Sequence, residues 1–262
     1  MRAAIRVRHY SLRIEQTYVH WVRRFIHLQG GRHPGALGGQ EVGQFLTALA
    51  LEQHVSAATQ NQALNALVFL YRQVLRREVD WIDHLMRAKR PHRLPLVLCR
   101  HEVKALLKAL EGEPWLMGHL LYGAGLRLME CLRLRVKDID FGANQITVRA
   151  GKGNKDRITM LPIAVKALLA AHLVRVRELH QQDLARGFGN VYLPDALHRK
   201  YPNAAKQWGW QWVFPASRIS VDPRSGAQRR HHLHEVVLQR AVRTAAQRAG
   251  IIKPVGCHTL SP

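Results

Sequence analysis

The chain is poor in acidic residues, in cysteines and in long apolar runs. Its 262 residues hold 18 Asp and Glu against 40 Lys and Arg, a formal charge of +22 at pH 7. Cys99, Cys131 and Cys257 lie far apart and form no CxxC pair, which argues against a disulfide framework and against a zinc site. No apolar run reaches the roughly 20 residues of a membrane span, and the first residues lack a signal-peptide core. We therefore expect an intracellular protein in a reducing compartment.

The excess of basic residues is spread along the whole chain. Up to Arg93 there are 14 basic and 6 acidic residues, and beyond it 26 and 12. Both parts are basic, which excludes a basic tail on a neutral domain and favours an extended polyanion that contacts both parts. Apolar residues make up 47% of the chain, enough for a sizeable core.

Apolar side chains at helical spacing predict an all-helical N-terminal domain over residues 1–90. Ser11 and Ser56 stand where helix caps are expected. The predicted helices are Ser11–Gln29, Gln40–Gln53, Ala57–Arg76 and a short one around Trp81–Met86.

A basic, proline-containing stretch, Arg87–Leu98, follows this domain and predicts an extended linker. Five cationic side chains within seven positions favour direct contact with phosphates, although an ordinary loop is the alternative. The expected contacts are Arg87, Lys89, Arg90, His92 and Arg93.

Residues 91–262 predict a mixed α+β domain with a small antiparallel sheet, so that the whole chain is mainly helical and has two domains. The expected helices are His101–Leu110, Pro114–Tyr122, Leu126–Leu134, Ile163–Arg186 and His231–Ala249. The expected strands are Val136–Phe141, Gln145–Arg149 and Arg157–Leu161, the last two joined by the turn GKGNKD.

The stretch 187–228 interrupts this regular pattern and is rich in tryptophan. Trp208, Trp210, Trp212 and Phe214 are spaced two apart, which predicts one face of a strand packed on the domain. Alternatively, the tryptophans stack on unpaired bases. After this stretch, Arg229, Arg230, His231 and His232 predict either a helix start beside DNA or a solvated basic turn. Adjacent histidines lack the spacing of metal ligands.

The segment from Leu120 to Pro162 predicts a grip on a phosphate. Arg127 follows GAG at a predicted helix start, where backbone N–H groups and a guanidinium can hold an anion together. Glu130 lies one turn further, where it can orient Arg127 or simply form an i,i+3 ion pair. Lys152 is placed at a hairpin tip, from which a lysine can donate a proton to a leaving oxygen.

Two stretches, GAGLRLMECLRLRVKDIDF and VRAGKGNKDRITMLP, resemble the catalytic domain of tyrosine recombinases, the phage integrase family. The helical unit and basic linker before them resemble that family's core-binding domain. HYSLRIEQTYVHWV, LPDALHRKYP and DPRSGAQRRHH resemble the integron integrases within it.

The resemblance implies cleavage and rejoining of DNA through a 3′-phosphotyrosine intermediate, without a metal or another cofactor. It makes Arg127 the first catalytic arginine, Lys152 the catalytic lysine and His258 a catalytic histidine, with Glu130 in support. Lys155, in the same turn as Lys152, is expected to contact DNA. The implied partners are duplex attI-like and folded single-stranded attC-like DNA in a bacterial cytoplasm, at the nucleoid. The implied assembly is a homotetramer.

The sequence departs from the family pattern at its end. Ser261 occupies the position of the second catalytic arginine, and every tyrosine precedes His258. We therefore expect a chain truncated by a frameshift, as a fragment or as a pseudogene. The alternative function is that of a catalytically inactive DNA-binding remnant that occupies recombination sites.

Overall fold

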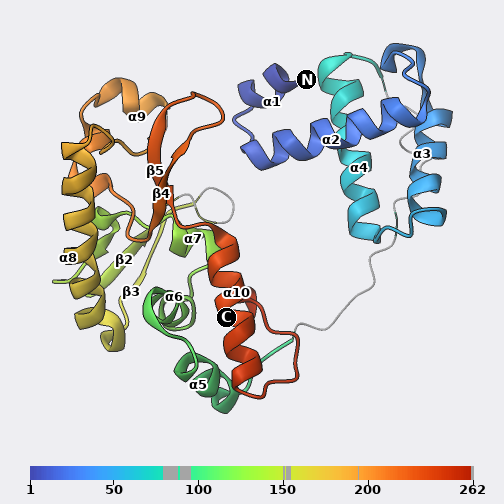
Figure 1. Cartoon of the computed structure of the whole chain (residues 1–262). Coiled ribbons are helices and arrows are strands. Elements are labelled where there is room, and N and C mark those ends of the chain that lie inside the picture. The colour runs from blue at the N-terminus through green and yellow to red at the C-terminus, as the bar shows by residue number, and fades with distance from the viewer. Residues whose placement is uncertain (79–87, 89–95, 150, 152–154, 194, 261–262) are drawn as a thin grey trace. The chain divides into compact units, whose positions relative to one another are not determined.

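The computed structural model describes all of the chain except residues 79–87, 89–95, 150, 152–154, 194 and 261–262. The contacts divide the chain into two compact units, Met1–Leu94 and Pro95–Pro262 (Figure 1). The predicted helix around Trp81–Met86 and the five linker cations lie outside the described residues.

The first unit is entirely helical in its described part. Its α-helices are α1 (Arg2–Val7), α2 (Leu12–Leu28), α3 (Gly39–Leu51) and α4 (Ala57–Phe69). A 3₁₀ turn over Pro34–Ala36 precedes α3, and a π-helical turn over Leu70–Val74 continues α4. The sequence missed α1, because six residues are too few for an apolar repeat to be recognised.

The predicted helix caps are confirmed. Ser11 Oγ accepts a hydrogen bond from the Ile14 N–H at 3.3 Å, and Ser56 Oγ accepts one from the Thr59 N–H at the same distance. The core of this unit lies between α2, α3 and α4. Its fully buried side chains include Phe25, Val42, Leu49, Ala63 and Leu67.

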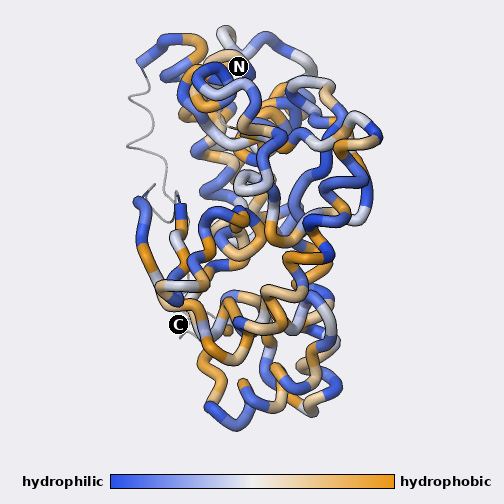
Figure 2. Tube along the Cα trace, turned by 90° about the vertical axis from the view of Figure 1, so that its left-hand side faces the viewer, coloured by the Kyte–Doolittle hydropathy of each residue, from blue (hydrophilic) through white to orange (hydrophobic). Residues whose placement is uncertain are grey.

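The second unit is mixed, which confirms the predicted fold class: a mainly helical chain with small antiparallel sheets. Its helices are α5 (Arg100–Lys108), α6 (Gly112–Gly123), α7 (Leu128–Leu132), α8 (Ile163–Ala185), α9 (Asp195–Lys200), α10 (Glu235–Arg248) and α11 (Cys257–Leu260). Its strands are β1 (Ile139–Asp140), β2 (Gln145–Val148), β3 (Arg157–Met160), β4 (Pro215–Val221) and β5 (Gln228–His232). In Figure 2, apolar and polar segments alternate along the helices, as one buried face requires.

Two small antiparallel sheets are present in the second unit. β1, β2 and β3 form one in that order, with Val148 opposite Arg157 where the hairpin opens. β4 and β5 form the other, with Ile219 opposite Arg230. The predicted strand Val136–Phe141 is wrong in its first half, where Val136–Asp138 is a 3₁₀ turn.

The main core of the second unit lies beneath α7. Side chains from α6, the segment before α7, β2 and α10 meet there without solvent exposure. They include Leu120, Leu126, Ile146, Leu238 and Val242. α7 has only five residues and contributes Leu128, Cys131 and Leu132 to this core. Packing therefore fixes the helix, since so short a helix is not stable on its own.

Candidate functional site

Arg127 stands at the start of α7, as predicted. Gly125 has φ +62°, a conformation that favours glycine, and it turns the chain out of α6. Arg127 is the N-cap residue, with an extended backbone (φ −74°, ψ 156°). Its side chain is 46% exposed. The guanidinium is thus accessible at the end of a helix that directs its first N–H groups outward.

Glu130 makes both of the interactions considered from the sequence. One carboxylate oxygen accepts a hydrogen bond from the Arg127 backbone N–H at 2.9 Å, and the other accepts one from Arg127 Nη1 at 2.9 Å. The Glu130 side chain is only 8% exposed. It therefore caps α7 and ties the Arg127 side chain to the helix.

Sequence analysis did not single out Arg157, the first residue of β3. Its Nη1 and Nη2 donate to the two carboxylate oxygens of Glu130 at 2.9 and 2.7 Å, and Nη2 also donates to the Gly125 carbonyl at 3.2 Å. These bonds, above all those from Arg157, lower the pKa of Glu130 to about 2. The only signal in the sequence was an arginine at the start of a predicted strand, 27 residues from its partner.

The base of the β2–β3 hairpin lies against this ion pair. The Gly151 N–H donates to the Lys155 carbonyl at 3.0 Å. A Cβ placed on Gly151 would stand 3.1 Å from Arg157 Nη1 and 3.2 Å from a Glu130 carboxylate oxygen. Thr159 Oγ1 donates to the Ala124 carbonyl at 2.9 Å, a further bond between β3 and the segment before α7. Lys155 is exposed, and Lys152 lies outside the described residues.

His258 is exposed on α11, whose Cys257 and Leu260 are buried. This short helix packs on α6 and α10, and both of those helices also contact α7. His258 and Arg127 thus belong to one packed group of helices.

The structure corrects the expected role of Arg230. The prediction of a helix from His231 is wrong, because Gln228–His232 is strand β5 and the helix begins at Glu235. The buried Arg230 guanidinium donates to Asp183 at 2.5 and 2.7 Å and to the Ala216 carbonyl at 2.7 Å. Its donors are directed into the protein, so it is not available to a phosphate. The pairing of β4 with β5, which the sequence did not predict, places Arg230 in this buried position.

Of the other predicted residues of β5, Arg229 and His232 are partly buried and His231 is exposed. Arg229 Nη2 lies 3.6 Å from Asp222 Oδ2 and donates a hydrogen bond to Ser225 Oγ at 2.9 Å. The exposed His231 stacks on Trp212 with the ring centroids 5.7 Å apart. Burial, above all, lowers the pKa of His232 to about 4, so this ring is neutral at pH 7.

The tryptophans do not form a strand face. Trp208–Trp210 is a 3₁₀ turn, and only Trp212 forms a single bridge, to Arg135. Trp212 is 5% exposed, and Phe214 is fully buried. The interpretation as core residues therefore fits Trp212, whereas Trp208 and Trp210 are half-buried.

Arg135, which the sequence analysis also missed, anchors this insertion to the segment that follows α7. Its guanidinium carbon lies 3.3 Å from the centroid of the Trp212 ring. Its Nη1 and Nη2 donate to the carbonyls of Trp210 and Tyr192 at 2.6 and 2.8 Å. Burial lowers the pKa of Arg135 to about 10, so it stays charged at pH 7.

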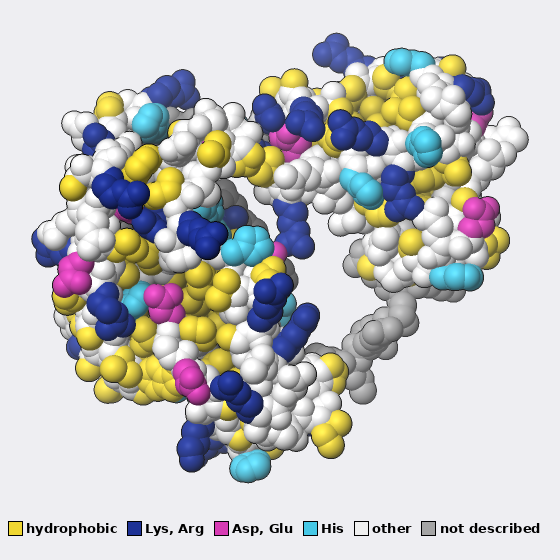
Figure 3. Space-filling model, in the orientation of Figure 1, with side chains coloured by type: hydrophobic (Ala, Val, Ile, Leu, Met, Phe, Trp, Pro, Cys, Tyr) yellow, Lys and Arg dark blue, Asp and Glu magenta, His cyan; other side chains and the backbone are white. Residues whose placement is uncertain are grey.

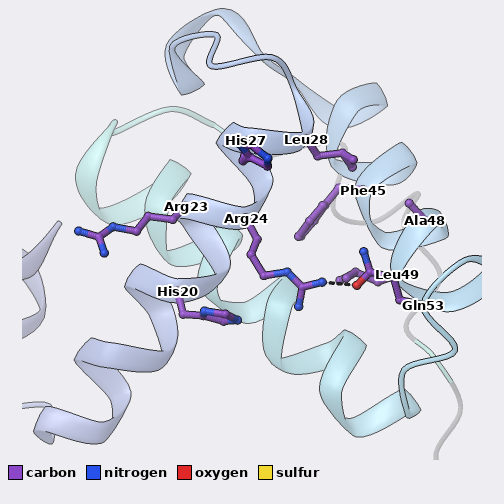
Figure 4. A pocket seen from close by; sticks show the side chains of 9 residues that line it. All are labelled: His20, Arg23, Arg24, His27, Leu28, Phe45, Ala48, Leu49 and Gln53. Carbon is purple, nitrogen blue, oxygen red and sulfur yellow. Dashed lines mark hydrogen bonds between the residues drawn. The ribbon is translucent and has the colours of Figure 1, made fainter.

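A basic groove of about 320 Å³ lies between α2 and α3 in the first unit. In Figure 4 the apolar side chains of α3 lie opposite the basic side chains of α2, among which Arg24 extends toward Gln53 and Arg23 points away from α3. The lining residues are His20, Arg23, Arg24, His27, Leu28, Phe45, Ala48, Leu49 and Gln53. Figure 3 shows Lys and Arg side chains over the drawn faces of each unit, with few Asp and Glu among them.

Within the described residues, no group of three or more His, Cys, Asp or Glu side chains is placed to hold a metal ion. Over the same part of the chain, none of the helices combines the length and the apolar character needed to span a membrane.

Comparison with known proteins identifies the family. Residues 97–260 match the phage integrase family, and residues 1–81 match the phage integrase N-terminal SAM-like domain. The chain belongs to the phage integrase family. An "Integrase/recombinase" of Escherichia coli is 50% identical to it over 260 residues, covering 99% of this chain and 77% of that protein. The tyrosine recombinase XerA of Thermococcus onnurineus is 35% identical over 163 residues, covering 60% of this chain and 54% of that protein.

Solved structures of phage integrase-type recombinases share the fold. A post-cleavage complex of the XerH site-specific recombinase with its palindromic difH substrate matches with a TM-score of 0.57 at 19% identity, covering 98% of this chain and 69% of that one. The Tn1549 transposon integrase in complex with transposon right end DNA matches with a TM-score of 0.61 at 14% identity, covering 98% of this chain and 81% of that one.

Proposed function

We propose that this chain acts in site-specific DNA recombination as a tyrosine-type recombinase. The observation that carries the proposal is the exposed Arg127 at the start of α7, tied to Glu130, which Arg157 also binds. Arg127 has donors beyond the one that Glu130 occupies, and a guanidinium can take two phosphate oxygens at once. Donors fixed before the reaction stabilise the charge that develops on the phosphorus oxygens in the transition state.

The remaining chemistry follows from the family resemblance. Lys152 protonates the leaving 5′ oxygen, and His258 assists at the phosphate. A tyrosine supplies the nucleophile: it forms a phosphodiester with the 3′ end and releases the 5′ hydroxyl, so the bond energy is retained for rejoining.

Both parts of the chain are proposed to contact DNA, as a core-binding domain over residues 1–90 and a catalytic domain over 91–262. The four side chains of α2 in the basic groove lie on one stripe of the helix, about 10 Å long at 1.5 Å per residue. Such a stripe matches the axial length of about three phosphates of one strand, at 3.4 Å each. The charge of +22 supports a polyanionic partner.

We further propose that the chain is of the integron type and recombines gene cassettes at attI-like and folded attC-like sites. The insertion 187–228 supports this, because part of it forms an apolar cluster of its own, in which Trp212 is buried. Within it, Trp208 and Trp210 are half-buried, so part of each ring remains for stacking on an unpaired base.

A second candidate function for the 262-residue polypeptide is DNA binding without strand cleavage. It is favoured by the charge of +22, which supports DNA binding whether or not a strand is cleaved. One experiment separates the two candidates. The polypeptide is incubated with a nicked attachment-site duplex, from which the cleaved strand end diffuses away and leaves any covalent adduct trapped.

An adduct that survives denaturation, and that Arg127→Ala abolishes, supports recombinase chemistry in this polypeptide. Salt-dependent binding without an adduct supports the second candidate. Absence of binding at 50 mM salt would refute both, because a protein that neutralises several phosphates binds tightest at low salt.

A further inference from the structure

Glu130 is the point where three parts of the second unit meet. It accepts hydrogen bonds from the backbone and side chain of Arg127, and from both Nη groups of Arg157. Arg157 also donates to the carbonyl of Gly125, two residues before Arg127. The guanidinium of Arg157 therefore binds the segment before α7 and the carboxylate within α7 at the same time.

We propose that Arg157 is a positioning residue for the phosphate grip: it fixes the Glu130 carboxylate, and through it the direction of the Arg127 guanidinium. This inference rests on the proposed role of Arg127. Without Arg157, Glu130 could swing toward Arg127 and take more of its donors. The guanidinium would then be turned away from a phosphate and partly neutralised.

The base of the β2–β3 hairpin also restricts the ion pair of Glu130 and Arg157. Gly151 leaves less than a Cβ's room beside Arg157, Glu130 and the Lys155 carbonyl. An added methyl group would stand 3.1 Å from Arg157 Nη1, 3.1 Å from the Lys155 carbonyl oxygen and 3.2 Å from a Glu130 carboxylate oxygen, so these neighbours must shift by a few tenths of an ångström. Gly151→Ala therefore disturbs the pair without removing a charge, and it serves as a second, independent perturbation.

The test follows the side-chain Nε–H resonance of Arg127 by ¹⁵N NMR in the full chain, with inorganic phosphate as the probe. The resonance that disappears in Arg127→Lys is assigned to Arg127. In the wild type, phosphate shifts it saturably. In Arg157→Ala we expect the apparent dissociation constant for phosphate to rise about tenfold, the equivalent of one charge-assisted hydrogen bond. Gly151→Ala should move it in the same direction by a smaller factor.

Two further measurements distinguish positioning from general destabilisation. Guanidinium chloride at a few millimolar, far below denaturing concentrations, should restore phosphate binding to Arg157→Ala, and equal sodium chloride should not. Arg149→Ala is the matched control. Arg149 directly follows β2 of the same hairpin and, like Arg157, it pairs with a buried carboxylate, that of Asp138, at 2.7 Å. The variant Arg149→Ala should leave the apparent dissociation constant for phosphate, followed at the Arg127 resonance, unchanged.

The proposal is overturned if folded Arg157→Ala binds phosphate at Arg127 as the wild type does, if Arg149→Ala weakens binding equally, or if the wild-type resonance ignores phosphate. These outcomes are separable from failure of the proposed function. That function fails when the wild type forms no covalent adduct with the nicked duplex, whatever the Arg157 variant does.

Discussion

The ion pair between Arg230 and Asp183 gives a prediction that separates folding from DNA contact. Their side chains are 10% and 5% exposed and meet through two hydrogen bonds of 2.5 and 2.7 Å. Removing one partner leaves a buried charge without compensation, which costs about 3–5 kcal/mol. Arg230→Met should therefore lower the melting temperature by roughly 6–20 °C, since each kcal/mol is worth about 2–4 °C in a chain of this size.

Thermal unfolding followed by circular dichroism measures this effect, with Asp183→Leu and the double variant completing a cycle. The double variant should recover most of the loss, because an apolar pair of similar volume replaces a buried ion pair at little cost. Duplex binding by the folded variants should keep the salt dependence of the wild type. A melting temperature unchanged in Arg230→Met, with a salt slope lower by about one, would show that Arg230 contacts a phosphate and refute the reasoning.

Three further predictions concern burial. The folded-state pKa of His232, about 4, lies below its unfolded value of 6.5, so its contribution to stability is complete above pH 6.5 and is lost as the pH falls toward 4. His232→Gln should flatten the melting temperature between pH 6.5 and 4, and an unchanged slope would contradict this. Trp212→Ala should cost about 3–5 kcal/mol in urea unfolding, because it opens a cavity and leaves the buried Arg135 without its ring; a cost below 1 kcal/mol would refute the packing described. Tyr71→Phe removes the buried hydrogen bond to the Leu37 carbonyl at 3.2 Å and should cost about 1 kcal/mol, with no change in DNA affinity as its control.

The long helices could be predicted from the sequence because their apolar positions repeat over several turns. The bounds of α2 differ from the prediction by one residue at each end, and those of α8 differ by one residue at the C-terminal end alone. The ion pair between Arg127 and Glu130 was predictable for a similarly local reason, since the two residues are three apart at the start of one short helix.

The missed features depend on contacts between distant residues. The strand β5 reads QRRHH, with no apolar alternation, and only its pairing with β4 makes it a strand. Arg230 finds its partner 47 residues earlier, and Arg157 finds its own 27 residues earlier. Neither separation leaves a periodic trace in the sequence, so these arginines could not be distinguished from the many that face solvent.

The crowding around Gly151 has an evolutionary consequence. Glycine, glutamate and arginine at positions 151, 130 and 157 fit one another so closely that a change at any one of them disturbs the other two. A larger residue at 151 displaces the ion pair of Glu130 and Arg157. The loss of either charge leaves the other without its partner. We expect related sequences to vary at these three positions together or not at all. In a lineage released from selection, the first substitution at any of them would make the other two free to drift.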